Sequence, residues 1–185
     1  MGRPREARQL AVMARLGESL RGRRVLVTQA RDFMGPALVE GFLEHGAEVF
    51  TGEEPLSEPG AAEELVRSAG DVDVLIANLS FPAPVTPAAE VGDDEWRAVF
   101  AHLVDPLPRL VRAVLPQMTA RGSGKVVVMG SAAALRGMRN SSTYSAARGA
   151  QVAYVRAVGT EVARLGIQVN LIAQNFVENQ TCFPD

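Results

Sequence analysis

Short apolar segments recur along this chain and alternate with longer segments of helical spacing. The run 73–77 (Asp-Val-Leu-Ile-Ala) has no polar–apolar alternation after its first residue, which indicates a strand buried on both faces. Such strands belong to parallel sheets covered by helices, so we expect an α/β fold with a Rossmann-like doubly wound parallel sheet. The predicted strands are 24–28, 47–50, 73–77, 125–129 and 168–172. The predicted helices are 35–45, 61–68, 93–118 with a break near 105–106, and 142–165.

The domain boundaries follow from this order of segments. We expect one Rossmann-like domain over 23–185, preceded by a basic N-terminal extension over 1–22 that lacks the apolar stretch of a secretory signal. Between Phe50 and Asp73 there is room for one helix and no further strand, so the sheet is expected to be short at that edge. Asp93 is expected to cap the next helix, and Trp96 to enter the core.

Composition excludes several classes of function. The 185 residues are 47% hydrophobic with a formal net charge of −2, so we expect no nucleic-acid partner and no membrane partner. Cys182 is the one cysteine and cannot form an internal disulfide, which favours a reducing, cytoplasmic location. His45 and His102 lack ligand-like spacing, so we expect no metal site and place both on helix surfaces.

Four features occur in an order that resembles the short-chain dehydrogenase/reductase family. Val27-Thr28 ends the first predicted strand, and Leu75-Ile-Ala-Asn78 ends a later one. Ser131 follows the next strand, and Tyr144 begins a Tyr-Ser-Ala-Ala-Arg run at the start of a helix. The resemblance covers residues 23–185 and implies the Rossmann-like fold already indicated by the strand pattern.

Three departures from that family pattern bear on the cofactor. The glycine-rich turn becomes Thr28–Gly35 (Thr-Gln-Ala-Arg-Asp-Phe-Met-Gly), so that Gln29 and Phe33 stand where glycine lets the backbone approach a pyrophosphate. Arg148 stands at the position of the family's lysine, which is not a conservative exchange. Leu103 stands at the position of its helix asparagine, which breaks the usual proton relay. We therefore expect no dinucleotide cofactor.

These departures agree with the halohydrin dehalogenases, which this chain resembles in two motifs and one loop. The motifs are Thr28, Phe33 and Gly35, and Ser131, Tyr144 and Arg148. The segment from Asn175 to Pro184 is similar to their halide-site loop. The resemblance implies a carbon–halide lyase that needs no cofactor and converts vicinal haloalcohols to epoxides and halide. It also implies the reverse opening of epoxides by azide, cyanide or nitrite.

Side-chain chemistry gives each candidate residue a role. Ser131, Tyr144 and Arg148 are the predicted catalytic residues. Tyr144 and Arg148 share a helix face at four-residue spacing, where a guanidinium favours the phenolate and makes the tyrosine a general base. Ser131 is expected to donate a hydrogen bond to the substrate oxygen. The predicted halide and substrate site contains Phe33, Asn175, Phe176 and Val177, with a ring edge and backbone N–H groups facing the anion.

Alternatives to this function stay open. Ser131 and Tyr144 also suit an NAD(P)-dependent short-chain dehydrogenase/reductase acting on an alcohol or carbonyl. The chain is alternatively an inactive fragment, because the sequence ends at Asp185 where the family continues, and the fold is expected to be C-terminally truncated. Ser131 could serve small-residue packing, and Asn78 is expected to satisfy backbone groups at a strand end rather than bind substrate.

Small residues are frequent in the last predicted helix, 142–165, and allow another helix to approach closely. The family pairs this helix and the Trp96 helix between subunits, so the resemblance implies a homo-oligomer, a dimer or tetramer, through the 94–121 and 142–165 helices. Packing of the small residues on the chain's own sheet is the alternative, and both can hold.

Overall fold

The computed structural model describes residues 19–177. Within that range the chain forms an entirely parallel sheet in the order β2-β1-β3-β4-β5. The strands are β1 (Arg24–Val27), β2 (Glu48–Thr51), β3 (Val74–Ala77), β4 (Gly124–Met129) and β5 (Ile167–Ile172). The predicted α/β fold with a Rossmann-like doubly wound sheet is confirmed. Of the predicted extension 1–22, residues 1–18 lie outside the described part of the chain.

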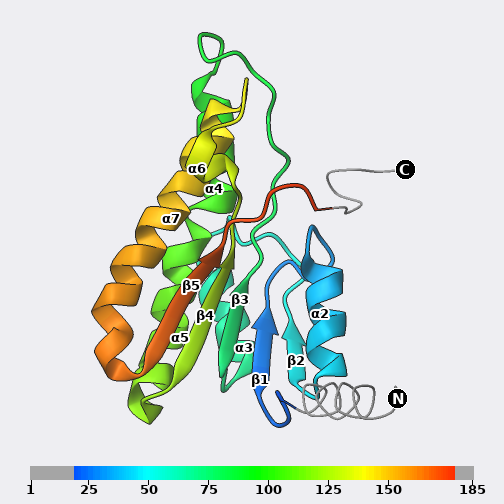
Figure 1. The fold of residues 1–185 in the computed structure, drawn as a ribbon, viewed down its shortest axis with the longest axis vertical. Helices are drawn as coiled ribbons and strands as arrows, with labels where there is room; N and C mark the ends of the chain where they lie inside the picture. Colours follow the sequence, from blue (N-terminus) through cyan, green and yellow to red (C-terminus); the bar gives the residue numbers. More distant parts are fainter. Residues whose placement is uncertain (1–18, 178–185) are drawn as a thin grey trace, which may run out of the picture.

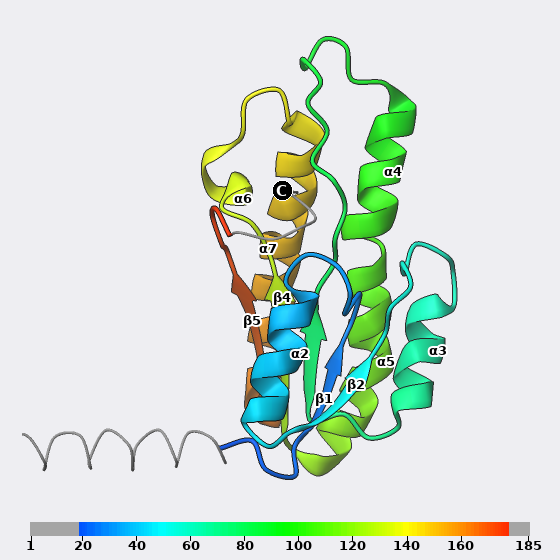
Figure 2. The same ribbon diagram turned by 90° about the vertical axis from the view of Figure 1, so that its right-hand side faces the viewer.

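Helices connect each strand to the next in sequence and cover both faces of the sheet (Figures 1 and 2). One face packs against α2 (Gly35–Glu44). The other face packs against α3 (Ala61–Ala69), α4 (Asp93–Leu103), α5 (Pro106–Arg121) and α7 (Ser142–Val162). A short α6 (Ala133–Arg136) follows β4, and a 3-10 turn over Ala163–Leu165 leads from α7 to β5.

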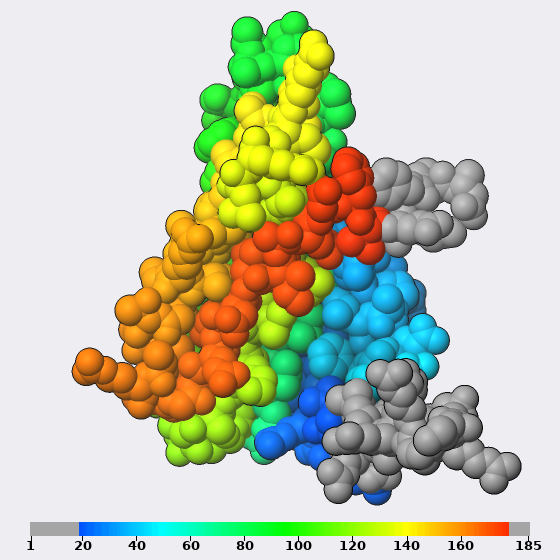
Figure 3. All heavy atoms as spheres, in the orientation of Figure 1, coloured from blue at the N-terminus to red at the C-terminus, as the bar shows by residue number. Residues whose placement is uncertain are grey.

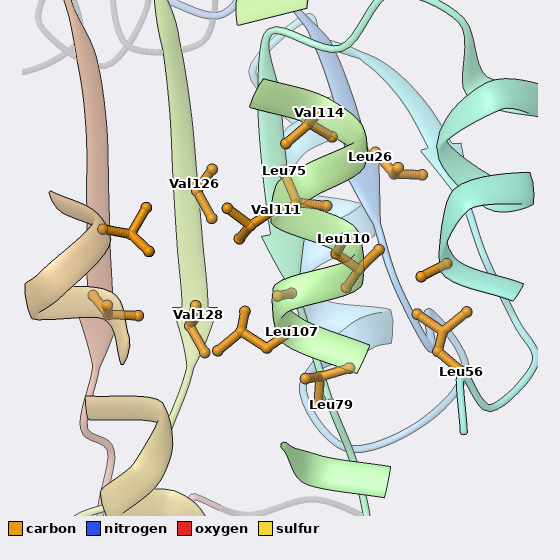
Figure 4. Close-up of a cluster of buried hydrophobic side chains, with 14 of the residues drawn as sticks. Leu26, Leu56, Leu75, Leu79, Leu107, Leu110, Val111, Val114, Val126 and Val128 are labelled. Atoms are coloured by element: carbon orange, nitrogen blue, oxygen red, sulfur yellow. The ribbon is translucent and has the colours of Figure 1, made fainter. Parts of the chain in front are cut away.

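The larger hydrophobic core lies between the sheet and α5. Figure 4 shows its side chains meeting from one face of the strands and one face of the helix: Leu26, Leu75, Val126, Val128, Leu107, Leu110, Val111 and Val114. Strand β3 is buried at every position because Val74 and Ile76 face the smaller core under α2. Packing on both faces is the physical reason for its continuous apolar run.

The edges of the sheet differ from its centre in the expected way. β2 is the edge next to β1, and α3 alone connects it to β3, so the predicted short edge is confirmed. At the other edge, β5 alternates between core-facing residues such as Ile167 and exposed residues such as Gln168 and Asn170. Burial on one face only explains why this strand, unlike β3, carries polar residues at two of its exposed positions, Gln168 and Asn170.

The predicted helix break near Asp105-Pro106 is confirmed, but two details of α4 were predicted wrongly. Gly92, not Asp93, is the N-cap, and Asp93 is the first helical residue, where its charge favours the positive end of the helix dipole. Trp96 is 45% exposed and stacks on Phe100 at 4.4 Å between ring centroids. In Figure 1, α4 extends beyond the ends of the strands, so its first turns have no strand beneath them.

All the strands point toward one end of the molecule, where the connecting segments gather. In Figure 1 the segment 79–92, α4 and α6 extend beyond the strand ends. On the face shown in Figure 3, β5 and the segment 173–177 lie at the surface. In residues 19–177 no helix has both the length and the apolar character needed to cross a membrane.

Candidate active site

The strand order reverses at β1, and this reversal locates the candidate site. From β1 the chain goes outward to β2 and then returns to the opposite side of β1 to form β3. In open α/β sheets ligands bind at such a switch point, in the crevice outside the carboxyl ends of the strands. Here that crevice is bordered by the turn Thr28–Gly35 after β1 and by the residues Asn78–Ser80 after β3.

The turn Thr28–Gly35 keeps left-handed backbone angles at two positions that are not glycine. Gln29 has φ of 43° and Phe33 has φ of 55°. Only glycine adopts such angles without steric cost, and other residues hold them when surrounding contacts fix the backbone. Of the three glycine positions in the family's turn, only the last is still glycine, at Gly35. A Cβ at Gly35 would lie 2.4 Å from the backbone oxygen of Ala30, so there is no room for a side chain.

The side chain of Gln29 closes the gap between the two segments. It is buried, its Oε1 accepts a hydrogen bond from the Ser80 N–H (2.6 Å), and its Nε2 donates to the Ser80 carbonyl (3.4 Å). The Asn78 Nδ2 donates to the carbonyls of Gln29 and Asp32, both at 2.9 Å. The predicted role of Asn78 in satisfying backbone groups is therefore confirmed. Together these contacts hold the turn against the end of β3.

This turn does not fit the pyrophosphate of a nicotinamide dinucleotide, the cofactor that this fold often binds. A dinucleotide turn needs bare backbone at its second glycine so that the phosphates can approach closely. Here Phe33 places an aromatic ring in the turn, and the Gln29 amide crosses to Ser80. The Gln29 amide and the Phe33 ring therefore stand where a dinucleotide-binding turn has exposed backbone for the phosphates.

Tyr144 and Arg148 lie on the first turns of α7, as their four-residue spacing predicts. The centre of the Arg148 guanidinium is 5.0 Å from the centroid of the Tyr144 ring and 5.9 Å from that of Phe33. The structure therefore brings together three predicted site residues from α7 and the β1 turn. Tyr144 is 9% exposed, and its hydroxyl makes no hydrogen bond with any residue in 19–177.

Arg148 is a buried cation that pairs with no carboxylate among residues 19–177. It is 1% exposed, and it makes no ion pair within the described range. Its Nη1 donates to the Met129 carbonyl (3.0 Å) and its Nη2 to the Leu79 carbonyl (3.1 Å), whereas its Nε is buried without a partner. Because a buried charge without an opposite charge is costly, this cation creates a site that favours an anion.

Ser131 follows β4 at the same end of the sheet. Its Oγ accepts a hydrogen bond from the Ala133 N–H at 3.2 Å, which fixes the side chain at the start of α6. A hydroxyl that accepts one hydrogen bond still has its own hydrogen to donate. In the described part of the chain that hydrogen has no acceptor, so Ser131 can donate to a ligand oxygen.

Of the predicted halide loop, only residues 175–177 are described, and they follow a segment that is hydrogen-bonded beside Ser131; residues 178–184 lie outside the described part of the chain. The Ala132 N–H donates to the Gln174 carbonyl at 2.7 Å, and Arg136 of α6 donates to the Asn175 Oδ1. Phe176 is 79% exposed. Val177 is partly buried at the end of the described range. Within that range the three residues therefore border the site from the α6 side and do not enclose it.

Gln151 belongs to this site although the sequence analysis did not select it. Its side chain is 0% exposed, and its Oε1 accepts a hydrogen bond from the Arg148 Nη1 at 3.1 Å. Its spacing of three residues from Arg148 on one helix was the available signal. For metals, residues 19–177 contain no group of three or more His, Cys, Asp or Glu side chains suited to a metal ion.

Comparisons with known proteins agree with the fold. The short chain dehydrogenase family matches residues 57–182. The 3-oxoacyl-acyl-carrier-protein reductase of Salmonella typhimurium is 26% identical over 185 residues, covering 86% of this chain and 75% of the reductase.

Two solved structures are similar over most of this chain. A protein described as a dehalogenation enzyme has a TM-score of 0.82 at 29% identity and covers 89% of this chain and 76% of its own. A gluconate 5-dehydrogenase from Burkholderia cenocepacia, in complex with NADP and tartrate, also has a TM-score of 0.82, at 23% identity over 90% of this chain and 76% of its own, and shows the shared fold. The family match covers more than half of the chain, which therefore belongs to the short-chain dehydrogenase family.

Proposed function

We propose that this chain is a halohydrin dehalogenase, a carbon–halide lyase that converts vicinal haloalcohols to epoxides without a redox cofactor. One observation carries the proposal. The buried Arg148 guanidinium lies 5.0 Å from the centroid of the Tyr144 ring and 5.9 Å from that of Phe33, and no carboxylate among residues 19–177 pairs with it. The proposed reaction forms two anions, a phenolate and a halide, and a buried cation such as Arg148 stabilises anions formed near it.

The residues divide the chemistry as follows. The substrate hydroxyl lies between Ser131 and Tyr144, and the Tyr144 phenolate takes its proton. The resulting alkoxide forms a bond to the adjacent carbon as the carbon–halogen bond breaks, and the halide leaves with the electron pair. The products are an epoxide, a halide ion and a proton, which Tyr144 returns to water. In reverse, azide, cyanide or nitrite opens the epoxide.

The leaving halide needs a weakly polar environment that tolerates a large anion. We assign the Phe33 ring to one wall, since the positive edge of an aromatic ring suits an anion. Asn175, Phe176 and Val177 supply backbone N–H groups from the α6 side of the site. The similarity to a dehalogenation enzyme, at 29% identity and a TM-score of 0.82, supports a reaction that releases a halide.

A second candidate is a nicotinamide-dependent reductase. It is favoured by the relatives that are named as reductases, including the Salmonella typhimurium protein that is 26% identical. It is opposed by Gln29 and Phe33, which occupy the turn where the cofactor phosphates would need bare backbone. Binding of NADPH, measured by titration of its fluorescence, separates the two candidates.

The decisive experiment follows halide release from a 1,2-haloalcohol in the absence of any nicotinamide. We expect release from the unaltered chain and a loss of about a thousandfold or more in Tyr144→Phe, since no general base remains. Tyr154→Phe is the matched control, because Tyr154 is the other of the two tyrosines and lies farther along α7. Release that depends strictly on NAD(P), or that survives in Tyr144→Phe, contradicts the proposal.

We also propose that copies of this chain assemble through the outer faces of α5 and α7. A groove between these helices is lined by apolar and charged side chains: Val111, Arg112, Leu115, Pro116, Thr119, Tyr154, Val158 and Glu161. These residues fall within the 94–121 and 142–165 helices predicted from the sequence. A contact between two identical faces must be self-complementary, and this face carries both a cation and an anion.

A further inference from the structure

The side chain of Gln151 links the end of α4 to the guanidinium of Arg148. Its Nε2 donates to the Leu103 carbonyl at 2.5 Å, and its Oε1 accepts from the Arg148 Nη1 at 3.1 Å. Both side chains are buried, and Leu103 itself is 0% exposed. A single amide therefore couples the end of α4 to the guanidinium in the candidate site.

The Leu103 carbonyl is available because the helix breaks there. In a continuous helix it would accept a hydrogen bond from Leu107. Instead the Leu107 N–H donates to Val104 (3.1 Å), and Pro106 has no N–H to donate. A buried carbonyl without a partner is costly, so the break leaves an acceptor that the Gln151 amide satisfies.

The contacts of Arg148 show what this amide does. Nη1 is held by Gln151 and Met129, and Nη2 by Leu79. The strand-end carbonyls fix the position of the guanidinium along the sheet edge. Gln151 is the one side chain in the described range that accepts a hydrogen bond from this cation. Without it, the guanidinium could turn about its two carbonyl contacts and away from the ring of Tyr144.

We propose that Gln151 is a positioning residue for Arg148, anchoring the guanidinium over Tyr144 through the Leu103 carbonyl freed by the α4–α5 break. This inference rests on the proposed function for its catalytic consequence, whereas its geometric part concerns Arg148 and Tyr144 alone. Around Arg148 the contacting groups are the Phe33 and Tyr144 rings, the Gln151 amide and two backbone carbonyls. Tyr144 is the titratable group among them.

The test uses two substitutions of similar size. Gln151→Met keeps the length of the side chain and removes both hydrogen bonds. Gln151→Glu keeps an oxygen for Arg148 but introduces a carboxylate that cancels the effect of the cation on Tyr144. Gln168→Met, at an exposed position of β5, controls for the exchange of glutamine by methionine. Thermal unfolding of each variant confirms that it is folded, and Gln151→Glu remains informative if the Met variant does not fold.

The kinetic readout is the separate effect on kcat and KM for a haloalcohol. We expect Gln151→Met to lower kcat by roughly tenfold or more with little change in KM, since a misplaced catalytic group affects the transition state. Gln151→Glu should move the acid side of the kcat–pH profile to higher pH, because an anion beside Arg148 opposes the attraction between the guanidinium and a phenolate. A purely structural role for Gln151 predicts lower unfolding temperature with unchanged kinetics.

A second readout does not depend on turnover. In a Tyr154→Phe background Tyr144 is the remaining tyrosine, so its phenolate can be followed by ultraviolet absorbance. We expect both Gln151 variants to require higher pH for this absorbance, the Glu variant most. If folded variants show unchanged absorbance, the positioning role is wrong. If absorbance shifts but the unaltered chain releases no halide, the positioning role stands and the proposed reaction is wrong.

Discussion

Gln29 and Phe33 hold left-handed backbone angles at the cost of about 1–3 kcal/mol each. The surrounding contacts explain why the turn keeps this conformation. The side-chain amide of Gln29 both accepts from and donates to the backbone of Ser80. The Asn78 side chain donates to the carbonyls of Gln29 and Asp32 within the turn. The turn keeps backbone angles that favour glycine, while the side chains of Gln29 and Phe33 give it a chemical surface that glycine would not.

Gly35 tests whether that path is obligatory. A Cβ at this position would lie 2.4 Å from the oxygen and 2.5 Å from the carbonyl carbon of Ala30, and backbone atoms cannot move aside cheaply. We expect Gly35→Ala to lower the free energy of unfolding by about 2 kcal/mol, as overpacking does in cores. Urea unfolding followed by circular dichroism measures the change.

Gly41 in the same helix is the matched control. A Cβ there meets nothing within 4 Å, and alanine is the better helix former, so Gly41→Ala should stabilise the chain by about 0.5–1 kcal/mol. Opposite signs for two Gly→Ala changes in one helix would show that close packing, not helix propensity, dictates Gly35. Equal effects at both positions would contradict this account of the turn.

At the residue scale, the sequence predicted the site residues that are related by regular spacing. It did not predict those whose role depends on a contact with a residue far away in the sequence. Tyr144 and Arg148 were found because four residues return to one face of a helix, and Phe33 because it replaces a glycine. Gln151 was missed because its role depends on Leu103, 48 residues away in the sequence. Trp96 was misplaced because nothing local shows that α4 extends beyond the sheet.

At the element scale, α3 and α5 are joined by an ion pair that should respond to pH. Glu63 pairs with Arg112 across the two helices. The hydrogen bond from Arg112, followed by one from the backbone N–H of Glu63, lowers the pKa of the Glu63 carboxyl below its ordinary value of 4.5. A lowered pKa means that the pair stabilises the fold above about pH 4.5 and stops doing so as the carboxyl becomes protonated at lower pH.

We expect Glu63→Gln to lower the free energy of unfolding by about 0.5 kcal/mol at neutral pH, since the Glu63 side chain is 37% exposed and solvent screens the pair. The difference from the unaltered chain should shrink toward zero as the pH is lowered to about 3. Urea titrations at a series of pH values measure it. Glu64→Gln, which removes a pair with Arg67 inside α3, is the control. A difference that grows at low pH would reverse the assigned sign.

The break between α4 and α5 shows how one element boundary serves two purposes. Asp105-Pro106 ends α4 and begins α5, which the sequence predicted from the proline. The same break leaves the Leu103 carbonyl for Gln151 and so reaches the site. A proline signal indicates where a helix ends, but the partner of the freed carbonyl depends on how α7 packs against α4.

At the scale of the whole molecule, the fold was predictable because the burial of each strand determines its pattern of apolar and polar residues. Strands covered on both faces are apolar throughout, as β3 is, and β5 alternates because one of its faces is exposed. The same pattern says nothing of how far the 173–177 segment closes over the site. That depends on individual contacts, such as those of Gln174 with Ala132 and of Asn175 with Arg136.

Assembly is the property of the whole molecule that most needs a direct test. The proposed contact uses the groove between α5 and α7, on the face of the sheet opposite α2. Thr119 is exposed at its rim near the end of α5, so Thr119→Arg adds a long charged side chain without disturbing the core. Burying that charge in a dimer contact without a partner would be costly.

We therefore expect the unaltered chain to elute in size-exclusion chromatography with light scattering at a multiple of the single-chain mass, and Thr119→Arg to shift toward that of one chain. Leu43→Arg places the same charge at an exposed position of α2, on the other face, and should leave the mass unchanged. Equal dissociation by both variants would point to a general effect of charge. An oligomer that resists Thr119→Arg but not Leu43→Arg would place the contact on the α2 face, because only a side chain inside the contact must give up its water when the subunits meet.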